Sequence, residues 1–300
     1  MTLSGAALPD VDSSRQWLGS GRPLLSFKEK WALFFLMPFA AMFVAFVSYP
    51  ILYALFLATD SSAYGRVIAD PIYARTLWNT FLFIVIGVML KMLLALGLSS
   101  FFVLPGRAIR IIAALFILPW AVPHIPSILS IRWMLNSEWG MINNLLFQIF
   151  GVDGPAWLTN PSYGMASIIT VHIWKYLPFW TMILVAARLG IPKELYESAR
   201  IDGAGSVQQF RYVTFPAIAN VFLTSTMLTT IWSLGDFNSI YLLTGGGPME
   251  RTNTLATMGI RYAFRHADFQ AGIVTLMSAL PILVPLVIVL TRRLRRNADA

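Results

Sequence analysis

The stretch Ile191–Pro216, IPKELYESARIDGAGSVQQFRYVTFP, is a long polar segment between two strongly apolar runs. Pro192 suits a first helical turn, where its missing N–H removes no hydrogen bond. Gly203 favours the left-handed conformation that ends a helix. Ser206, with Gln209 three residues later, has the form of a capping box that opens a second helix. The stretch therefore predicts a helix, a glycine turn and a second helix, held against a membrane.

The composition is that of a membrane protein. Of the 300 residues 57% are hydrophobic and 12% are charged, and the mean hydropathy is +0.67. Soluble domains of this size keep about a quarter of their residues charged. The chain has no cysteine, and its three histidines lie far apart in sequence, so we expect neither a disulfide nor a metal site. No glycine-rich phosphate loop is present, so any ATP hydrolysis belongs to another chain and this chain is not expected to be an enzyme.

Six apolar runs are each long enough to cross about 30 Å of hydrocarbon, which predicts an all-α polytopic protein with six transmembrane helices. Pro50 is expected to kink or unwind the end of the first run. Pro119, Pro123 and Pro126 predict that the third is bent, with freed carbonyls that need partners from neighbouring helices or a watery cavity. The runs are Trp31–Ala58, Thr76–Leu104, Ile111–Leu135, Met165–Leu189, Ala217–Leu243 and Ala271–Leu290.

Between the runs, residues 136–161 predict an interfacial loop with a short amphipathic helix, and the segment that contains Arg251, Arg261 and Asp268 predicts a polar loop. The domain prediction has three parts. They are a cytoplasmic tail at 1–30, a six-helix domain at 31–291 that includes the loop 191–216, and a basic cytoplasmic end at 292–300.

The lysines and arginines set the expected orientation. With the N-terminus inside, 14 of the 22 fall in inner segments, six fall in outer loops, and Lys91 and Lys175 lie within spans. Both termini and the loop 191–216 are then cytoplasmic. The net charge of +8 is therefore a topology signal, and we expect no nucleic-acid partner. A helix-turn-helix DNA reader is disfavoured because both flanks of the loop are membrane spans.

The same loop carries a resemblance to a known family. Glu197-Ser198-Ala199, then Gly203 and, nine residues later, Val213–Pro216 resemble the "EAA" loop of ABC importer permeases of the maltose/glycerol-phosphate type. Ser198 replaces the usual middle alanine, and Phe215 replaces the usual leucine. The segment Tyr241–Pro248 resembles an outer loop of the same permeases, and the resemblance covers roughly residues 30 to 295.

The resemblance implies a set of partners. The loop would be a coupling helix that docks in an ATPase subunit through Glu197, with Ala199 and Gly203 allowing close approach and Asp202 bracing the turn. ATP and Mg²⁺ would be bound by a dimer of ATPase subunits, and this chain would bind no cofactor. A second permease subunit, which makes a heterodimer, and an extracytoplasmic solute-binding protein complete the assembly, in the inner membrane of a bacterium or archaeon.

The resemblance also places a solute pathway in the spans on either side of the loop. His172, Tyr176 and Phe179 lie at i, i+4 and i+7, on one stripe of the fourth span. Trp232 and Asp236 are expected one turn apart on the fifth. Trp120, beside the prolines, is a further candidate. Aromatic faces and a carboxylate suit a neutral sugar or polyol.

Interhelical packing is the alternative for these residues, with Asp236 paired to Lys175, and Lys91 is expected to pair or snorkel between helices. The interpretation adopted is a permease subunit of a binding-protein-dependent ABC importer for a sugar, polyol or glycerol derivative. The alternatives are a permease for a non-carbohydrate solute, a secondary transporter, which would need an ion-coupling site, and an intramembrane enzyme, for which the catalytic cluster is missing.

Overall fold

The computed structural model describes residues 27–298, and the described residues form helices joined by turns, with no strand among them. The chain divides into two compact units, residues 1–56 and 57–300. Most of the predicted tail, residues 1–26, and the last two residues lie outside the part that the structure describes.

The first unit contains α1 (Phe27–Phe43), the π-helical turn Val44–Ser48 and most of α2 (Tyr49–Leu57). The π turn lies just before Pro50, which cannot donate a helical hydrogen bond to the carbonyl of Phe46. The helix is not unwound there, since Trp31–Leu57 is one helical segment, and the irregularity beside this proline is the π-helical turn.

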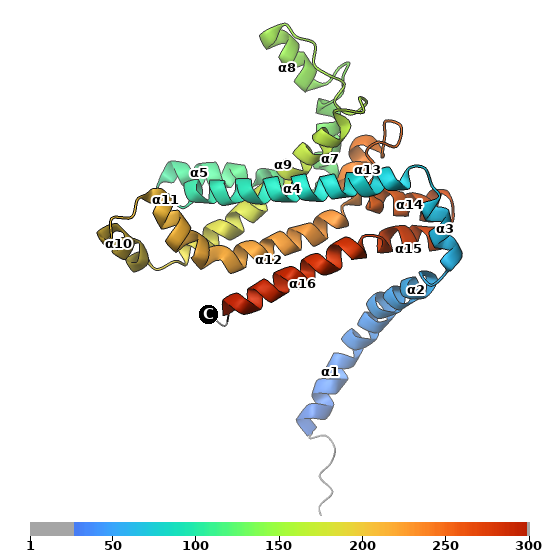
Figure 1. Cartoon of the computed structure of the whole chain (residues 1–300), viewed down its shortest axis with the longest axis horizontal. Coiled ribbons are helices and arrows are strands. Elements are labelled where there is room, and N and C mark those ends of the chain that lie inside the picture. The colour runs from blue at the N-terminus through green and yellow to red at the C-terminus, as the bar shows by residue number, and fades with distance from the viewer. Residues whose placement is uncertain (1–26, 299–300) are drawn as a thin grey trace, which may run out of the picture. The chain divides into compact units, whose positions relative to one another are not determined.

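The second unit is a bundle in which α4 and α9 lie side by side, α12 contacts both, and α16 runs along α12 (Figure 1). The short helices α10 and α11 lie at one end of this bundle, and α3, α14 and α15 lie at the other, which we call the α14 end. The helices are α3 (Ser61–Ile68), α4 (Tyr73–Phe102), α5 (Arg107–Phe116), α6 (Leu118–Ala121), α7 (His124–Met134), α8 (Met141–Phe150), α9 (Gly164–Leu189), α10 (Lys193–Ile201), α11 (Ser206–Gln209), α12 (Phe215–Leu234), α13 (Phe237–Thr244), α14 (Leu255–Arg265), α15 (Phe269–Met277) and α16 (Leu280–Ala298).

Apolar residues cover both sides of α4, so hydrophobicity alone does not choose its buried face. Val88 and Met92 pack against Trp180 of α9, whereas Val85 and Met89 are exposed. In a membrane, close fit and polar contacts decide which face is buried, because lipid tails are as apolar as leucine. The buried face of α4 is accordingly the one that also carries Thr76, Asn79, Thr80, Gly87, Lys91 and Ser99.

The prediction that the chain crosses a membrane several times is confirmed, but the number of six spans is not. Among the described residues, four helical segments are long and apolar enough to cross a bilayer. The pair Arg107–Ala121 and His124–Met134, bent by 95° at its break, makes a fifth candidate if it counts as one span. The chain is therefore a multi-pass membrane protein, and the predicted bend of its third span is confirmed.

Three segments differ from the predictions. The sixth run was expected to be one helix over Ala271–Leu290, but α15 ends at Met277 and α16 begins at Leu280. The fifth run was expected to be one helix over Ala217–Leu243, but α12 ends at Leu234 and α13 begins at Phe237. Asp236 caps α13 through its side chain, and so starts a new helix inside the predicted run. The polar loop expected around Arg261 is also wrong, because α14 occupies Leu255–Arg265 with its first turn buried.

Candidate functional site

The helix, turn and helix predicted for residues 191–216 are confirmed. Gly203 has φ +79°, a left-handed conformation that L side chains rarely adopt. Around it the Ala204 N–H donates to Ala199 O at 2.9 Å, and the Gly203 N–H donates to Arg200 O at 3.0 Å. These two bonds form a Schellman motif, which ends α10 and reverses the chain toward α11.

The predicted capping box is displaced by one residue. The N-cap of α11 is Gly205, whose N–H donates to Gln208 Oε1 at 2.8 Å, while Gln209 Nε2 donates to Ala204 O. The helix then continues through a π-helical turn into α12, so that Ser206–Leu234 is one helical segment. The short helix after the glycine turn is therefore rigidly joined to a membrane span.

The surface of this loop is mixed. Glu197, Asp202 and Gly203 are exposed and Ala199 is half-buried. Ile201 and Val207, on either side of the turn, are 87% and 80% exposed. Apolar side chains gathered on an otherwise polar loop are typical of a surface that contacts another protein.

The break between α6 and α7 is held by one lysine. Pro123 and Pro126 have no N–H, and so leave the carbonyls of Pro119 and Val122, four residues earlier, without helical donors. Lys175 Nζ of α9 donates to both carbonyls, at 2.7 and 2.6 Å. The expected partners for the freed carbonyls thus come from the neighbouring helix, and one buried ammonium serves both.

A cluster of three buried polar side chains links α4, α9 and the start of α13. Lys91 Nζ lies 2.9 Å from His172 Nε2, and His172 Nδ1 lies 2.9 Å from Asp236 Oδ2. All three side chains are less than 10% exposed. The other carboxylate oxygen of Asp236 accepts from the Ser239 N–H at 3.0 Å, which starts α13. The pairing expected for Lys91 between helices is confirmed.

Hydrogen-bond chemistry fixes the proton on the imidazole. An ammonium only donates and a carboxylate only accepts, so His172 must accept at Nε2 and donate from Nδ1. The ring is then neutral, and the charges of Lys91 and Asp236 balance across it. A buried lysine and aspartate that would each be costly alone are therefore paired through a histidine.

An aromatic row lies at the less buried side of these contacts. Trp120 of α6 stacks on Phe179 of α9 with ring centroids 5.0 Å apart, and Phe179 stacks on Trp232 of α12 at 5.9 Å. Trp120 and Trp232 are 41% and 53% exposed. Tyr176, one turn from Phe179, stacks on His124 with centroids 5.9 Å apart. The row offers flat aromatic faces from three helices.

The six predicted pathway residues therefore fall into two layers. His172 and Asp236 are buried and bonded to one another, while Trp120, Phe179 and Trp232 form the aromatic row and Tyr176 contacts both His172 and His124. The alternative pair Asp236–Lys175 is wrong, since the two side chains have different partners. Trp232 and Asp236 are also not one turn apart on a single helix, because α12 ends between them.

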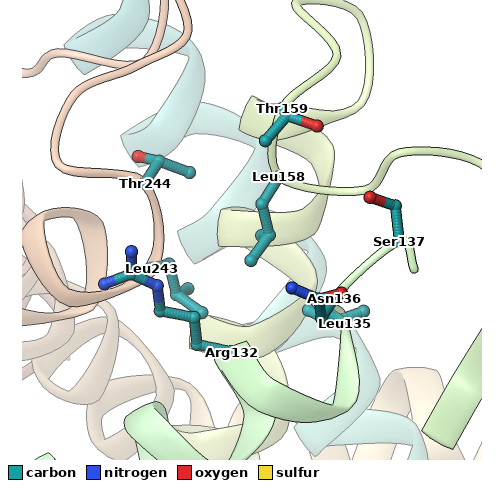
Figure 2. A pocket seen from close by; sticks show the side chains of 8 residues that line it. All are labelled: Arg132, Leu135, Asn136, Ser137, Leu158, Thr159, Leu243 and Thr244. Atoms are coloured by element: carbon teal, nitrogen blue, oxygen red, sulfur yellow. The ribbon is translucent and has the colours of Figure 1, made fainter. Parts of the chain in front are cut away.

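A polar cavity of about 170 Å³ lies among α7, α13 and the segment before α9 (Figure 2). Leu158 points into it, and Arg132 donates from Nη1 to Leu242 O at 3.1 Å. Its volume is below the roughly 300–1,000 Å³ of typical ligand sites. Sequence reasoning did not single out this cavity, since its polar residues come from three separate segments.

No group of three or more metal-ligating side chains occurs among residues 27–298. The described part of the chain thus offers no cluster that would hold a metal ion.

The family model for binding-protein-dependent transport system inner membrane components matches residues 87–297. The chain belongs to this family, and is a permease subunit of an ABC importer. It is 30% identical over 255 residues to the sulfoquinovosyl glycerol transport system permease protein SmoG of Agrobacterium fabrum, covering 80% of each chain. It is 33% identical over 211 residues to the trehalose/maltose transport system permease protein MalF of Thermococcus litoralis, covering 70% of each.

The fold agrees with a solved structure. A chain of a bacterial alginate ABC transporter, crystallised with a periplasmic protein that holds an alginate pentasaccharide, superposes with a TM-score of 0.79. The superposition covers 90% of this chain and 96% of that chain, and the two sequences are 21% identical. The TM-score establishes that the two chains share a fold.

Proposed function

We propose that this chain forms half of the translocation pathway for a sugar, polyol or sugar-linked glycerol derivative. The aromatic row, with stacked rings from α6, α9 and α12, is the observation that carries the solute class. Aromatic faces stack on the C–H surfaces of sugar rings, and a row without a free charge suits a neutral solute. The names of the relatives, which are permeases for sulfoquinovosyl glycerol and for trehalose and maltose, support the same class.

Within this proposal the two layers have different roles. Trp120, Phe179 and Trp232 contact the solute, with Tyr176 beside them. His172 and Asp236 lie behind the row and set the positions of α9 and α13 through the buried Lys91 contact. Asp236 reaches the solute only if α13 shifts, because its two oxygens are already occupied by His172 and Ser239.

The solute role is tested by removing one ring at a time. Trp232→Ala should lower the apparent affinity of uptake for the solute by about tenfold or more while basal ATP hydrolysis and assembly persist, because an exposed stacking surface is lost and the coupling loop is untouched. Ile201→Ala, which removes an exposed apolar side chain at the opposite functional surface, is a matched control for solute affinity. Unchanged uptake affinity in Trp232→Ala would remove the row from the pathway.

The coupling role rests on α10 and its turn. We propose that Glu197, Ala199, Asp202 and Gly203 contact an ATPase subunit, which binds ATP and Mg²⁺ as part of a dimer. The exposed apolar side chains of Ile201 and Val207 would be covered in that contact. Rigid continuity from α11 into α12 would carry the movement of the loop into the span that holds Trp232.

Charge reversal at the loop tests this contact. Glu197→Lys should sharply lower solute-stimulated ATP hydrolysis or release the ATPase, since like charges at an interface cost several kcal/mol. Glu194→Lys, in the same helix, is the control for a general change of charge. Normal stimulated hydrolysis in Glu197→Lys would place this residue outside the contact.

The remaining partners follow from the same assembly. We propose a second permease subunit and an extracytoplasmic solute-binding protein as partners. We also propose six spans, with α15 and α16 as the sixth, and both termini in the cytoplasm.

Because the chain has no cysteine, single substitutions such as Ser198→Cys and Asp153→Cys can report the topology. Ser198→Cys should react with a membrane-impermeant thiol reagent only from the cytoplasmic side, and Asp153→Cys only from the other. Labelling from the same side would overturn the proposed topology.

A further inference from the structure

At the α14 end of the bundle, four arginines have identifiable partners. These partners are acidic side chains, a backbone carbonyl or an aromatic ring, so each guanidinium is accounted for by the fold. Arg66 pairs with Asp268 at 2.9 Å, Arg261 with Glu250 at 2.7 Å, Arg132 with Leu242 O at 3.1 Å, and Arg265 lies 6.0 Å from the centre of the Tyr241 ring.

Arg75 and Arg251 are the exceptions. Within residues 27–298, neither guanidinium has a hydrogen-bond, ion-pair or ring partner, and both side chains are exposed. Both line the same cavity of about 580 Å³, and no acidic residue lines it. Two unneutralised guanidinium groups that share a cavity concentrate positive potential there, which favours an anion.

The two arginines are held together by the fold. Asn79, one turn beyond Arg75 on α4, is buried, and its Nδ2 donates to Arg251 O and to Asn253 O, each at 2.9 Å. The segment that carries Arg251 is therefore bonded to α4 through the side chain of Asn79. Both arginines line one cavity because the segment that carries Arg251 is bonded to the helix that carries Arg75.

The walls of the cavity change character along α4. Arg75, Trp78 and Leu82 lie at i, i+3 and i+7, one stripe that runs from the start of the helix into its apolar part. Trp78 is 57% exposed, and tryptophan is enriched at the headgroup level of membranes. Met165, at the start of α9, continues the apolar wall. Charge, aromatic ring and aliphatic side chain follow one another in the order in which a phospholipid presents its phosphate, its interfacial region and its acyl chains.

We propose that this cavity binds the phosphate headgroup of an anionic phospholipid, with Arg75 and Arg251 on the phosphate and with Trp78 and Leu82 along the lipid. Guanidinium groups bind phosphate through paired, charge-assisted hydrogen bonds. A volume of about 580 Å³ falls within the range of sites that take a small ligand. The apolar wall favours a lipid over a soluble anion or an acidic side chain of a partner protein, since those would leave Leu82 and Met165 uncovered.

The proposal is tested by native mass spectrometry of the full chain with its co-purifying subunits, titrated with phosphatidylglycerol or phosphatidylcholine. Wild type should bind at least one phosphatidylglycerol more tightly than phosphatidylcholine. Arg75→Gln with Arg251→Gln should weaken that binding by about tenfold or more, because two charge-assisted contacts are lost. Arg75→Lys with Arg251→Lys should retain part of it.

Arg265→Gln is the matched control, since it removes one positive charge at the same end but outside the cavity; it should leave phosphatidylglycerol binding unchanged. Equal loss in Arg265→Gln, or equal binding by wild type and the double glutamine variant, would overturn the site. Displacement of the lipid by millimolar glycerol phosphate would assign the cavity to a soluble phosphate. Unchanged lipid binding with loss of stimulation by the solute-binding protein would assign the arginines to that protein.

Discussion

Two breaks between helices of this permease, α6–α7 and α12–α13, are built in opposite ways. The break between α6 and α7 is caused by Pro123 and Pro126, which remove donors, so that Lys175 must supply replacements from another helix. The break between α12 and α13 contains no proline. There the carboxylate of Asp236 supplies acceptors. One oxygen caps α13 through the Ser239 N–H, and the other is bonded to His172.

The two breaks differ in which backbone groups lose their hydrogen-bond partners. A proline break leaves carbonyls without donors, and in a membrane a buried cation from a neighbouring helix can satisfy them. A capped break leaves N–H groups without acceptors, and a carboxylate satisfies them locally. That carboxylate then needs a counter-charge, which Lys91 provides through His172. In both cases a charged side chain within a span closes a gap in the backbone hydrogen bonding.

Loss of the carboxylate should have the largest effect. Asp236→Ala removes the cap of α13 and leaves Lys91 and His172 buried without their acid, which by analogy with broken buried ion pairs costs about 3–5 kcal/mol. The expected result is a large fall in yield and in the apparent Tm of the purified protein. Asp236→Ala combined with Lys91→Met should recover part of that loss, because both charges are then absent. If the double variant is no more stable than Asp236→Ala, the charges are not coupled through His172.

Loss of the Lys175 ammonium should have the next largest effect. Lys175→Met leaves the carbonyls of Pro119 and Val122 without donors, at a cost of about 1–3 kcal/mol for each unsatisfied group. The apparent Tm should fall, and Trp120 should lose its fixed position against Phe179. Pro123→Ala added to Lys175→Met allows α6 to extend by a residue and offer an N–H to Pro119 O, and should restore part of the Tm. Rescue of Lys175→Met by Asp236→Asn instead would show that Lys175 and Asp236 are paired after all.

A second aspartate cap, at the α14 end of the bundle, shows the same arrangement at a more exposed position. Asp268 caps α15, and the Ala271 N–H, together with Arg66, lowers the pKa of its carboxyl below the ordinary value of 3.8. Because the folded pKa lies below the unfolded one, its stabilisation is present above the unfolded pKa and is lost as the pH falls through the folded pKa. Asp268→Ala should cost about 1 kcal/mol. Hydrogen exchange at Ala271 should accelerate in that variant, with little change elsewhere. Global unfolding would contradict a local cap.

The smallest effect is expected at the glycine beside the second break. Gly235 has φ −89°, which any residue adopts, and a Cβ built there meets only Trp232 O at 3.9 Å. Gly235→Ala should therefore change stability by no more than about 0.5 kcal/mol. Solute uptake and apparent Tm measured side by side check this. A loss as large as that of Lys175→Met would mean that the break depends on the glycine and not on Asp236.

The sequence was informative wherever a local rule decides the structure. Gly203 predicted the end of α10, since a left-handed residue is a local requirement that glycine meets best. Three prolines predicted the bend of the third span, because a missing N–H is a property of the residue itself. The two carbonyls left without donors also follow from the positions of Pro123 and Pro126, but nothing local names Lys175 as their partner.

The sequence by itself thus determined the class of this protein: an all-helical, multi-pass permease with a polar helical loop, because hydropathy, prolines and glycines act over a few residues. Only the tertiary structure decided that α12 stops at Leu234, that Lys175 and Asp236 have separate partners, and that three aromatic rings from distant segments form one row. The physical reason is that a charge within a span is satisfied by whichever helix packs beside it. Helix neighbours are set by the fit of whole faces, which are apolar on every side and carry little sequence signal.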